Sequence, residues 1–264
     1  LNAVERLINH LMEQLQIHNI NIAATGYYLG MASCSILEPV VYLYDITRNP
    51  RYLSFAKSIV SSIEREGSSQ LITKTLKNIP VSERSAFPKS WWSFENGQKA
   101  YEMMSCYEGL LELYKVTGNP LYLEKLHEYW AFADSLMYDP EDALYYRDGK
   151  YLYPKHKSVN GKKDFWARGD GWVLAALAKV LKDLPETDKY RQEYIDRYRA
   201  MAKAVAACQQ PEGYWTRSLL DPEHAPGPET SGTAFFTYGL LWGMNNGFLD
   251  KATYQPVVEK AWKY

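Results

Sequence analysis

An internal repeat constrains the fold of this chain more strongly than any other feature of its sequence. Residues 38–59 (EPVVYLYDITRNPRYLSFAKSI) align without gaps on residues 108–129 (EGLLELYKVTGNPLYLEKLHEY). Each copy has an apolar stretch, a short turn that ends in Asn-Pro, and a second stretch that opens near a Tyr-Leu pair. Proline fixes φ near the value of a first helical turn, so Pro50 and Pro120 are expected to start helices. The repeat therefore predicts two copies of a helical hairpin.

Two weaker copies extend this pattern over residues 173–198 and 235–262. The spacing of the four copies, roughly 65 to 70 residues, is typical of proteins built from repeated supersecondary units. In each hairpin the first helix is apolar around much of its circumference, whereas the second carries charge on one side. Such a pattern indicates inner and outer helices that alternate around a ring. We therefore expect an all-α fold, an α/α toroid that forms a single domain over residues 1–264.

Two long segments that we expect to be non-helical, about 66–96 and 139–165, end just before inner helices. With residues 3–17 as a leading helix, the pattern predicts nine helices in all. Long connections in a compact domain are usually functional, and in a toroid both would lie at one mouth of the ring. The side chains that suit sugars there are Trp91, Trp92 and Phe94 in the first segment, and Tyr145, Tyr146, Arg147, Asp148, Tyr151, Tyr153 and His156 in the second.

Composition excludes several other classes of protein. With 30 Lys and Arg against 31 Asp and Glu, the chain lacks the basic surface of a nucleic-acid or membrane-surface protein. No apolar run approaches the length of about 20 residues that crosses a bilayer. The three cysteines form no CxxC pair, which indicates buried thiols rather than disulfides or a zinc site. The first residues show no signal peptide, which favours a cytoplasmic location without excluding export.

The segment FWARGDGW, residues 165–172, carries the first candidate substrate contacts. Asp170 stands between two glycines, which predicts that a helix starts close by. Arg168 and Trp172 are four residues apart and would project from one face of its first turn. A guanidinium beside an indole at the positive end of a helix suits a carboxylate on a sugar ring. An alternative is a capping turn in which Arg168 pairs with a structural acid. Trp166 is a further candidate contact in the same segment.

The inner helix near residues 98–114 holds the candidate catalytic residue, Glu102. A carboxylate near the start of an apolar helix is costly unless it is paired or protonated, and burial would make it a usable general acid. Glu38 repeats Glu108, so we interpret those two as structural, which leaves Glu102 without a counterpart in the repeat. The alternative is that Glu102 also holds the ring together. Cys106 has no histidine nearby in the sequence to make it a nucleophile.

The proline-rich segment 214–236 leads into the fourth inner helix. Glu229 and the two residues after it resemble an N-cap sequence. His224 is a candidate substrate donor on this segment, although a single histidine in a loop is more often only solvated.

Two parts of the chain resemble different known families. Residues 140–264 resemble the unsaturated rhamnogalacturonyl hydrolases of glycoside hydrolase family 105, through LYYRDGKY, NGKKDFWARGDGWVLAALAKVLKDLP and the long segment from GYWTRSLLDPEHAPGPETSGTAFF to the end. Residues 22–132 are similar instead to family 127, relatives of β-L-arabinofuranosidases, through GYYLGMASCSILEPVVYLYDITRNPRYL and PKSWWSFENGQKAYEMMSCYEGLLELYKVTGNPLYL. Both families are α/α toroids. The change of resemblance falls near 133–140.

The family 105 resemblance implies a site and a reaction. Arg168 and Trp172 match the Arg and Trp of an RGxGW motif that lines the pocket for an unsaturated uronic acid, and Glu102 takes the place of the family's acid/base aspartate. The implied reaction is hydration of the C4=C5 double bond of unsaturated galacturonyl oligosaccharides from pectin. Glu102 would protonate C4, water would add at C5, and the hemiketal would open. Trp92 would stack on the ring, and no metal or organic cofactor is implied.

The resemblances leave two further hypotheses open. A complete ring of this kind has twelve helices, so nine would make an open ring, one completed or covered by a homodimer, or a recombined or engineered hybrid. A hybrid could be a non-catalytic scaffold. The second hypothesis is an arabinofuranosidase, but the Glu-x-Cys segment and the later cysteine pair of family 127 have no counterpart in this chain.

Overall fold

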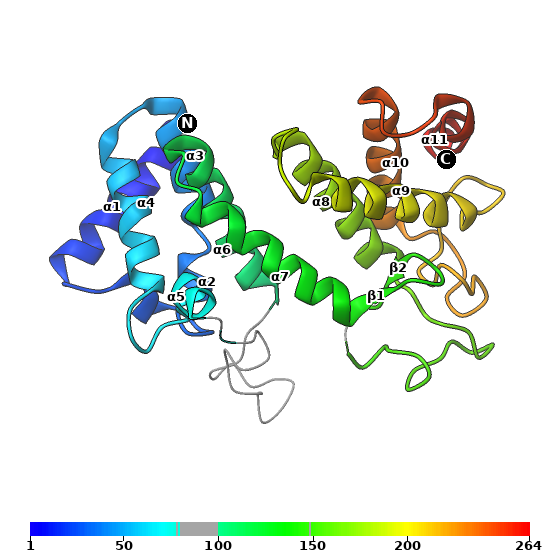
Figure 1. Ribbon diagram of the computed structural model, residues 1–264, viewed down its shortest axis with the longest axis horizontal. Coiled ribbons are helices and arrows are strands. Elements are labelled where there is room, and N and C mark those ends of the chain that lie inside the picture. The colour runs from blue at the N-terminus through cyan, green and yellow to red at the C-terminus, as the bar shows by residue number, and fades with distance from the viewer. Residues whose placement is uncertain (78, 80–99, 148) are drawn as a thin grey trace. The chain divides into compact units, whose positions relative to one another are not determined.

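The computed structural model describes residues 1–77, 79, 100–147 and 149–264 (Figure 1). Its described part divides into two compact units, Leu1–Phe132 and Ala133–Tyr264. The first unit contains α1 (Asn2–Ile17), η1 (Ile22–Thr25), α2 (Met31–Cys34), α3 (Leu37–Thr47), α4 (Pro50–Ile63), α5 (Leu71–Leu76), α6 (Ala100–Thr117) and most of α7 (Leu121–Met137). The second contains β1 (Tyr138–Asp139), β2 (Leu144–Tyr145), α8 (Ala167–Asp183), α9 (Arg191–Ala207), α10 (Thr230–Asn245) and α11 (Lys251–Lys263).

The all-α prediction is confirmed, and each of the nine expected helices has a counterpart in the described residues: α1, α3, α4 and α6 to α11. The described residues contain α2 and α5 in addition, and α5 lies within segment 66–96, where no helix was expected. The expectation that residues 1–264 form one toroid domain stays a prediction. The first inner helix departs from expectation, because the predicted stretch breaks after α2 and resumes at α3. Ser33 and Ser35 each donate a side-chain hydrogen bond to the carbonyl three residues back, Gly30 and Ala32. Such bonds compete with the helical ladder and favour a turn at this point.

The two hairpin turns of the first unit, which the sequence repeat predicts, have the same hydrogen bonds. Thr47 and Thr117 each donate from Oγ1 to the carbonyl four residues back, at 2.6 Å in both copies. Asn49 and Asn119 each cap the following helix by accepting from the amide two residues on, at 3.1 Å. A residue with positive φ stands between them in each turn, at φ 55° in the first copy and 69° in the second. The repeat therefore encodes the turn as well as the helices.

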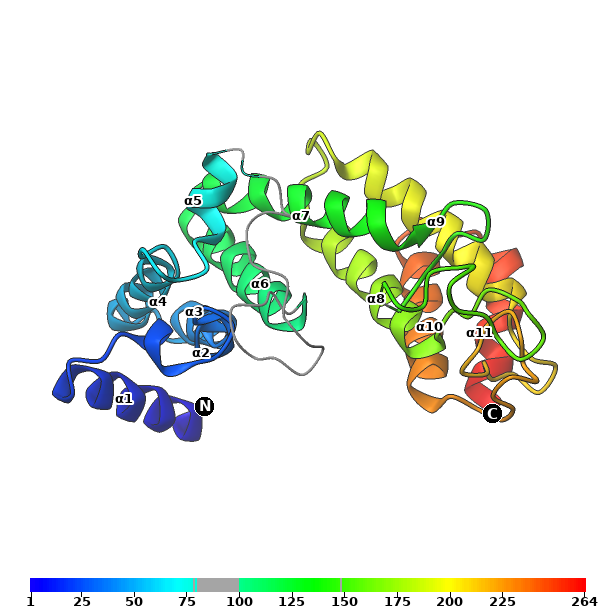
Figure 2. The same cartoon turned by 90° about the horizontal axis from the view of Figure 1, so that it is seen from below.

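Glycines set how closely the inner helices of each unit approach. In the first unit a Cβ at Gly109 of α6 would lie 2.6 Å from the Leu37 side chain of α3. In the second, a Cβ at Gly171 of α8 would lie 2.9 Å from Phe235 of α10, and one at Gly239 of α10 would lie 2.7 Å from Leu174. The helices α8 and α10 therefore pack against each other over their lengths, side by side in Figure 2.

Two loops of the second unit are joined where they enter α8 and α10. An isolated bridge pairs Trp166 with Ser218, and the Leu219 amide donates to the Phe165 carbonyl at 3.0 Å. The Ala167 amide at the start of α8 donates to the Arg217 carbonyl at 2.9 Å. These bonds hold residues 151–166 and 214–229 together beside the N-terminus of α8.

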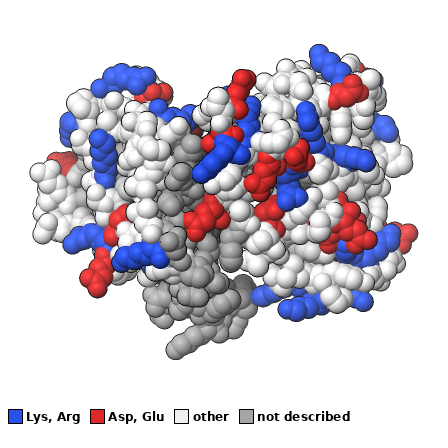
Figure 3. All heavy atoms as spheres, viewed as in Figure 1, with Lys and Arg blue, Asp and Glu red and all other residues white. Residues whose placement is uncertain are grey.

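The surface and the cysteines agree with the composition. Lys and Arg are interspersed with Asp and Glu on the face shown in Figure 3. Cys34 and Cys106 are buried and Cys208 is partly buried, all three as free thiols. Among the described helices, none is long and apolar enough to cross a membrane.

Candidate functional site

The N-terminal turn of α8 presents Arg168 and Trp172 together. Both side chains lie on one face, four residues apart, and each is 59% exposed. The Trp172 ring packs on Phe235 of α10, with 4.4 Å between the ring centroids. The pair thus offers solvent a guanidinium and an indole at the positive end of a helix, where a carboxylate is favoured.

Glu229 is the acid that Arg168 meets. Arg168 Nε lies 3.6 Å from Glu229 Oε1, and Glu229 also caps α10 by accepting from the Gly232 amide at 2.5 Å. The N-cap prediction for Glu229 is therefore confirmed. Arg168 therefore does pair with a structural acid, which is the alternative considered from the sequence. Because this pairing uses only Nε of an exposed guanidinium, it is compatible with binding a substrate carboxylate as well.

Asp170 belongs to the same turn of α8, and its side chain is fully buried. Its Oδ1 accepts a hydrogen bond from the Tyr145 amide of β2 at 2.8 Å, whereas Oδ2 has no hydrogen-bond partner among the described residues. Burial raises the pKa of this carboxyl well above its usual value, and the Tyr145 bond only partly offsets that rise. Burial thus favours the neutral form of Asp170, whose Oδ1 links the start of α8 to β2.

Aromatic and guanidinium groups are stacked beside the same helix end. Arg147 Cζ lies 4.5 Å from the centroid of a Trp166 ring, and Arg217 Cζ lies 4.8 Å from one. Arg147 also donates from Nη1 to the Tyr151 hydroxyl at 2.9 Å. Tyr151 packs edge-on against Trp166 with centroids 5.5 Å apart. Trp166, a candidate substrate contact, is thus partly enclosed by protein groups.

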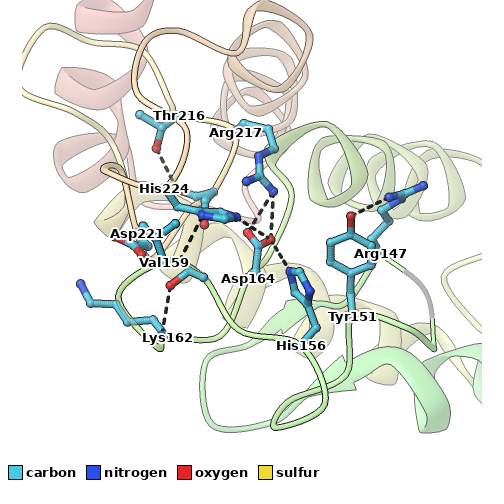
Figure 4. Close-up of polar contacts among 12 residues, drawn as sticks. Arg147, Tyr151, His156, Val159, Lys162, Asp164, Thr216, Arg217, Asp221 and His224 are labelled. Carbon is cyan, nitrogen blue, oxygen red and sulfur yellow. Dashed lines mark hydrogen bonds and ion pairs between the residues drawn. The ribbon is translucent and has the colours of Figure 1, made fainter.

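Asp164 is the centre of a polar cluster in this region. Figure 4 shows Arg217, His156 and His224 converging on its carboxylate. Arg217 Nη1 lies 2.9 and 3.1 Å from the two oxygens, His156 Nε2 lies 3.0 Å from Oδ2, and His224 Nε2 lies 3.4 Å from Oδ2. Burial alone would raise the pKa of Asp164, but its hydrogen bonds and the Arg217 charge outweigh burial and lower it. The carboxyl is therefore ionised.

His224 is occupied at both ring nitrogens. Its Nδ1 accepts from the Val159 amide at 3.1 Å, which requires the proton of the neutral ring to be on Nε2, facing Asp164. This geometry favours a structural role for His224 over the substrate contact expected from sequence. Sequence reasoning missed Asp164 and Arg217, because they lie in loops without periodic pattern and meet over a separation of 53 residues.

Two groups in the described residues have the spacing of metal ligands, and each already contains a cation of the chain. Asp139, Glu141 and Asp142 surround Lys163 Nζ at 2.9, 2.7 and 2.7 Å. In the group of His156, Asp164 and His224, the Arg217 guanidinium supplies the positive charge. His224 could bind a metal through Nε2 only by giving up its contact with Asp164, or through Nδ1 only by giving up its bond from Val159.

The structure gives less information on Glu102 and Trp92. Glu102 lies in the first turn of α6, as expected from the sequence, but its side chain is outside the described residues. Trp92 lies outside them altogether.

Comparison with known proteins decides the family. The model of Glycosyl Hydrolase Family 88 matches residues 102–264, more than half of the chain. The chain belongs to that family. The match begins at Glu102 and includes the Arg168–Trp172 turn, the Asp164 cluster and α8 to α11.

Two solved structures are similar to this chain over most of its length. Glycosyl hydrolase family 88 from Bacteroides vulgatus is 40% identical, with a TM-score of 0.61, and covers 99% of this chain and 84% of that one. A polysaccharide lyase is 58% identical, with a TM-score of 0.70, over 89% of this chain and 60% of that one. Since single proteins match across residues 133–140, the family 127 resemblance and the hybrid have no support.

A curated relative and a further structure complete the comparison. An unsaturated 3S-rhamnoglycuronyl hydrolase from Alteromonas sp. (strain LOR) is 45% identical over 152 residues, 57% of this chain and 36% of the relative. The chain thus spans little more than a third of that relative's length. A possible member of family 105 from Klebsiella pneumoniae is 23% identical, with a TM-score of 0.62, over 88% of this chain and 56% of that one. It shares the fold, and the α/α-toroid class expected from the repeat is confirmed.

Proposed function

We propose that this family 88 chain acts in the hydrolysis of unsaturated uronyl oligosaccharides. The observation that carries the proposal is the exposed Arg168–Trp172 pair at the N-terminus of α8. A guanidinium binds an ionised carboxylate, and an indole stacks on a flat ring. An unsaturated uronate has both groups side by side, so it suits this pair. The name of the Alteromonas relative, an unsaturated 3S-rhamnoglycuronyl hydrolase, supports the same substrate class.

Four of the candidate residues have a part in the proposed reaction. Arg168 holds the carboxylate, and Trp172, with Trp92, stacks on the ring. Glu102, protonated, delivers its proton to C4 and then helps a water molecule add at C5. The resulting hemiketal opens and releases the sugar. A single well-placed acid suffices for this chemistry.

The test is the loss of ultraviolet absorbance from the C4=C5 double bond of an unsaturated uronyl disaccharide. Wild type is expected to remove the absorbance, and Glu102→Gln to lower kcat by about 10²–10⁴-fold, the usual contribution of a general acid. A Glu108→Gln variant is the matched control, because Glu108 belongs to the repeat and not to the proposed site. Wild-type rates in Glu102→Gln would remove Glu102 from the mechanism.

A second candidate is a lyase that acts on saturated uronides. It is favoured by the polysaccharide lyase that is 58% identical over 89% of the chain. A lyase forms the C4=C5 double bond that the hydrolase removes, so the sign of the absorbance change separates the two activities.

An arabinofuranosidase and a non-catalytic hybrid are weaker hypotheses than these two. Nothing in the comparisons favours either of them. A homodimer that covers an open ring stays a prediction, as does the identity of the sugar next to the uronate.

A further inference from the structure

We infer that His156, oriented by the buried carboxylate of Asp164, is a proton-transfer residue for β-elimination at a uronate. The inference rests on the second candidate function above, a lyase activity, and assigns the group that would perform its central step. Every residue it uses lies in the second unit.

The two histidines on Asp164 differ in a way that matters for chemistry. His224 has both ring nitrogens engaged, with Nδ1 accepting from the Val159 amide at 3.1 Å and Nε2 lying 3.4 Å from Asp164. His156 meets the same carboxylate through Nε2 at 3.0 Å, and its side chain is 32% exposed against 18% for His224. Asp164 thereby places the proton of His156 on Nε2 and leaves Nδ1 as the proton acceptor.

Asp164 has the properties of an orienting carboxylate. It is fully buried, ionised, and fixed by Arg217 at 2.9 and 3.1 Å. A buried carboxylate on one nitrogen of a partly exposed imidazole selects the tautomer and ring orientation, which is the arrangement used for general bases. Asp164 is therefore a positioning residue and His156 the catalytic one.

The neighbours of His156 supply the other two groups that elimination needs. The Tyr151 ring stacks on the His156 ring with centroids 4.3 Å apart, and the Tyr151 hydroxyl accepts a hydrogen bond from the exposed Arg147 at 2.9 Å. Arg147 provides a cation for a uronate carboxylate, and Tyr151 a phenolic proton donor. Tyr151 also contacts Trp166, which directly precedes α8.

The proposed step balances without a further reactant. Arg147 neutralises the carboxylate, which makes the C5 proton more acidic. His156 Nδ1 takes that proton, the C5–H electron pair becomes the C4=C5 double bond, and the bond from C4 to the glycosidic oxygen breaks. Tyr151 gives its proton to the leaving oxygen, and solvent returns a proton to Tyr151 and removes one from His156. The products are an unsaturated uronide and a sugar whose former glycosidic oxygen is a free hydroxyl group.

A matched pair of substitutions tests the inference. Glutamine at position 224 can accept from the Val159 amide and donate to Asp164, and glutamine at 156 can still donate to Asp164, but neither takes up a proton. With saturated galacturonate and glucuronate oligosaccharides as probes, His156→Gln is expected to lower the rate of absorbance gain by about 10²-fold or more. His224→Gln is expected to stay within a few-fold of wild type.

Two further readouts separate catalysis from folding. Free imidazole is expected to restore part of the activity of His156→Ala, which a purely structural role would not allow. The loss in His156→Gln is expected in kcat with little change in KM, because the variant removes the proton acceptor and keeps the hydrogen bond to Asp164.

The outcomes distinguish the inference from the function on which it rests. If wild type produces the double bond and His156→Gln does so equally fast, or if both glutamine variants lose activity together without imidazole rescue at position 156, the inference is wrong and the lyase function stands. If wild type produces no double bond from any probe, both are wrong, while the hydrolase proposal is untouched.

Discussion

At the scale of single residues, the pKa values of two buried aspartates in the second unit are shifted in opposite directions. Arg217 and two histidines surround Asp164 and favour its ionised form, whereas Asp170 has a single amide donor and one oxygen without a partner among the described residues, which favours its neutral form. The sequence places one of them just before the FWARGDGW motif and the other within it. Their charge states were not predictable from it, because the partners of Asp164 come from loops far along the chain.

The neutral state of Asp170 gives a pH prediction. Because its folded pKa is raised, the native state holds a proton that the unfolded chain releases above the usual aspartate pKa. The free energy of unfolding therefore falls as pH rises from that value toward the raised pKa. An Asp170→Asn variant should lack this pH dependence of the free energy of unfolding, and it should be more stable than wild type at pH values near the raised pKa. Urea unfolding across pH measures it.

Asp164→Asn is the control with the opposite sign. The lowered pKa of Asp164 means that its contribution is present above the usual aspartate pKa and is lost as pH falls through the folded pKa. This variant should be destabilised by about 3–5 kcal/mol at neutral pH, since it leaves Arg217 without its buried partner. Equal pH slopes in the two variants would contradict the assigned charge states.

At the scale of elements, the hairpins were predictable and the loops were not. Helix spacing, Asn-Pro turns and the Glu229 cap follow from local patterns, which the structure confirms at the turns near Asn49 and Asn119. The break between α2 and α3 depends on serine side chains that bond back to the backbone, a local competition that apolar periodicity does not reveal. The Asp164 cluster could not be predicted in this way, because its residues come from two loops, 151–166 and 214–229, that are brought together only in the folded chain.

The repeated turn gives an element-scale prediction at Gly118. Its φ is 69°, and a Cβ there would have no atom within 4 Å, so a substitution meets no packing obstacle. Gly118→Ala should nevertheless cost about 1 kcal/mol of stability, because a residue with a Cβ adopts a left-handed conformation less readily. Thermal unfolding measures the change. A stabilised variant would mean that the turn adopts another conformation.

Arg48 is the natural comparison for Gly118, since it takes the same position in the first copy with φ 55°. It pairs with Asp45 at 2.9 Å, although both side chains are largely exposed, so the pair adds little stability. Arg48→Gly should therefore leave stability unchanged or raise it slightly.

At the scale of the whole molecule, the fold class and the helical hairpins could be anticipated from one sequence. Uronate binding by Arg168 and Trp172 stays a prediction. The expected change of family within the chain has no support, because one family 88 structure matches 99% of it. Short motifs shared by toroid families explain that expectation, since similar hairpins need similar turns and apolar faces.

The predicted homodimer also belongs to this scale. Exposed apolar side chains on α10 and α11 include Tyr238, Leu241 and Trp262, of which Trp262 is 80% exposed. Covering such side chains favours association. Light scattering should give twice the mass of the chain, and a monomer mass at all concentrations would contradict the dimer.

Recognition of a uronate carboxylate by Arg168 underlies the proposed hydrolase activity, and it can be measured by comparing an unsaturated uronyl disaccharide with its methyl ester. Wild type should show kcat/KM about 10- to 100-fold higher for the free acid, the value of a charge-assisted hydrogen bond. Arg168→Gln should process both substrates at similar low rates, and Arg168→Lys should keep part of the preference. If Arg168→Gln, folded to the same melting temperature as wild type, still prefers the free acid, the carboxylate is bound elsewhere and Arg168 is not its receptor.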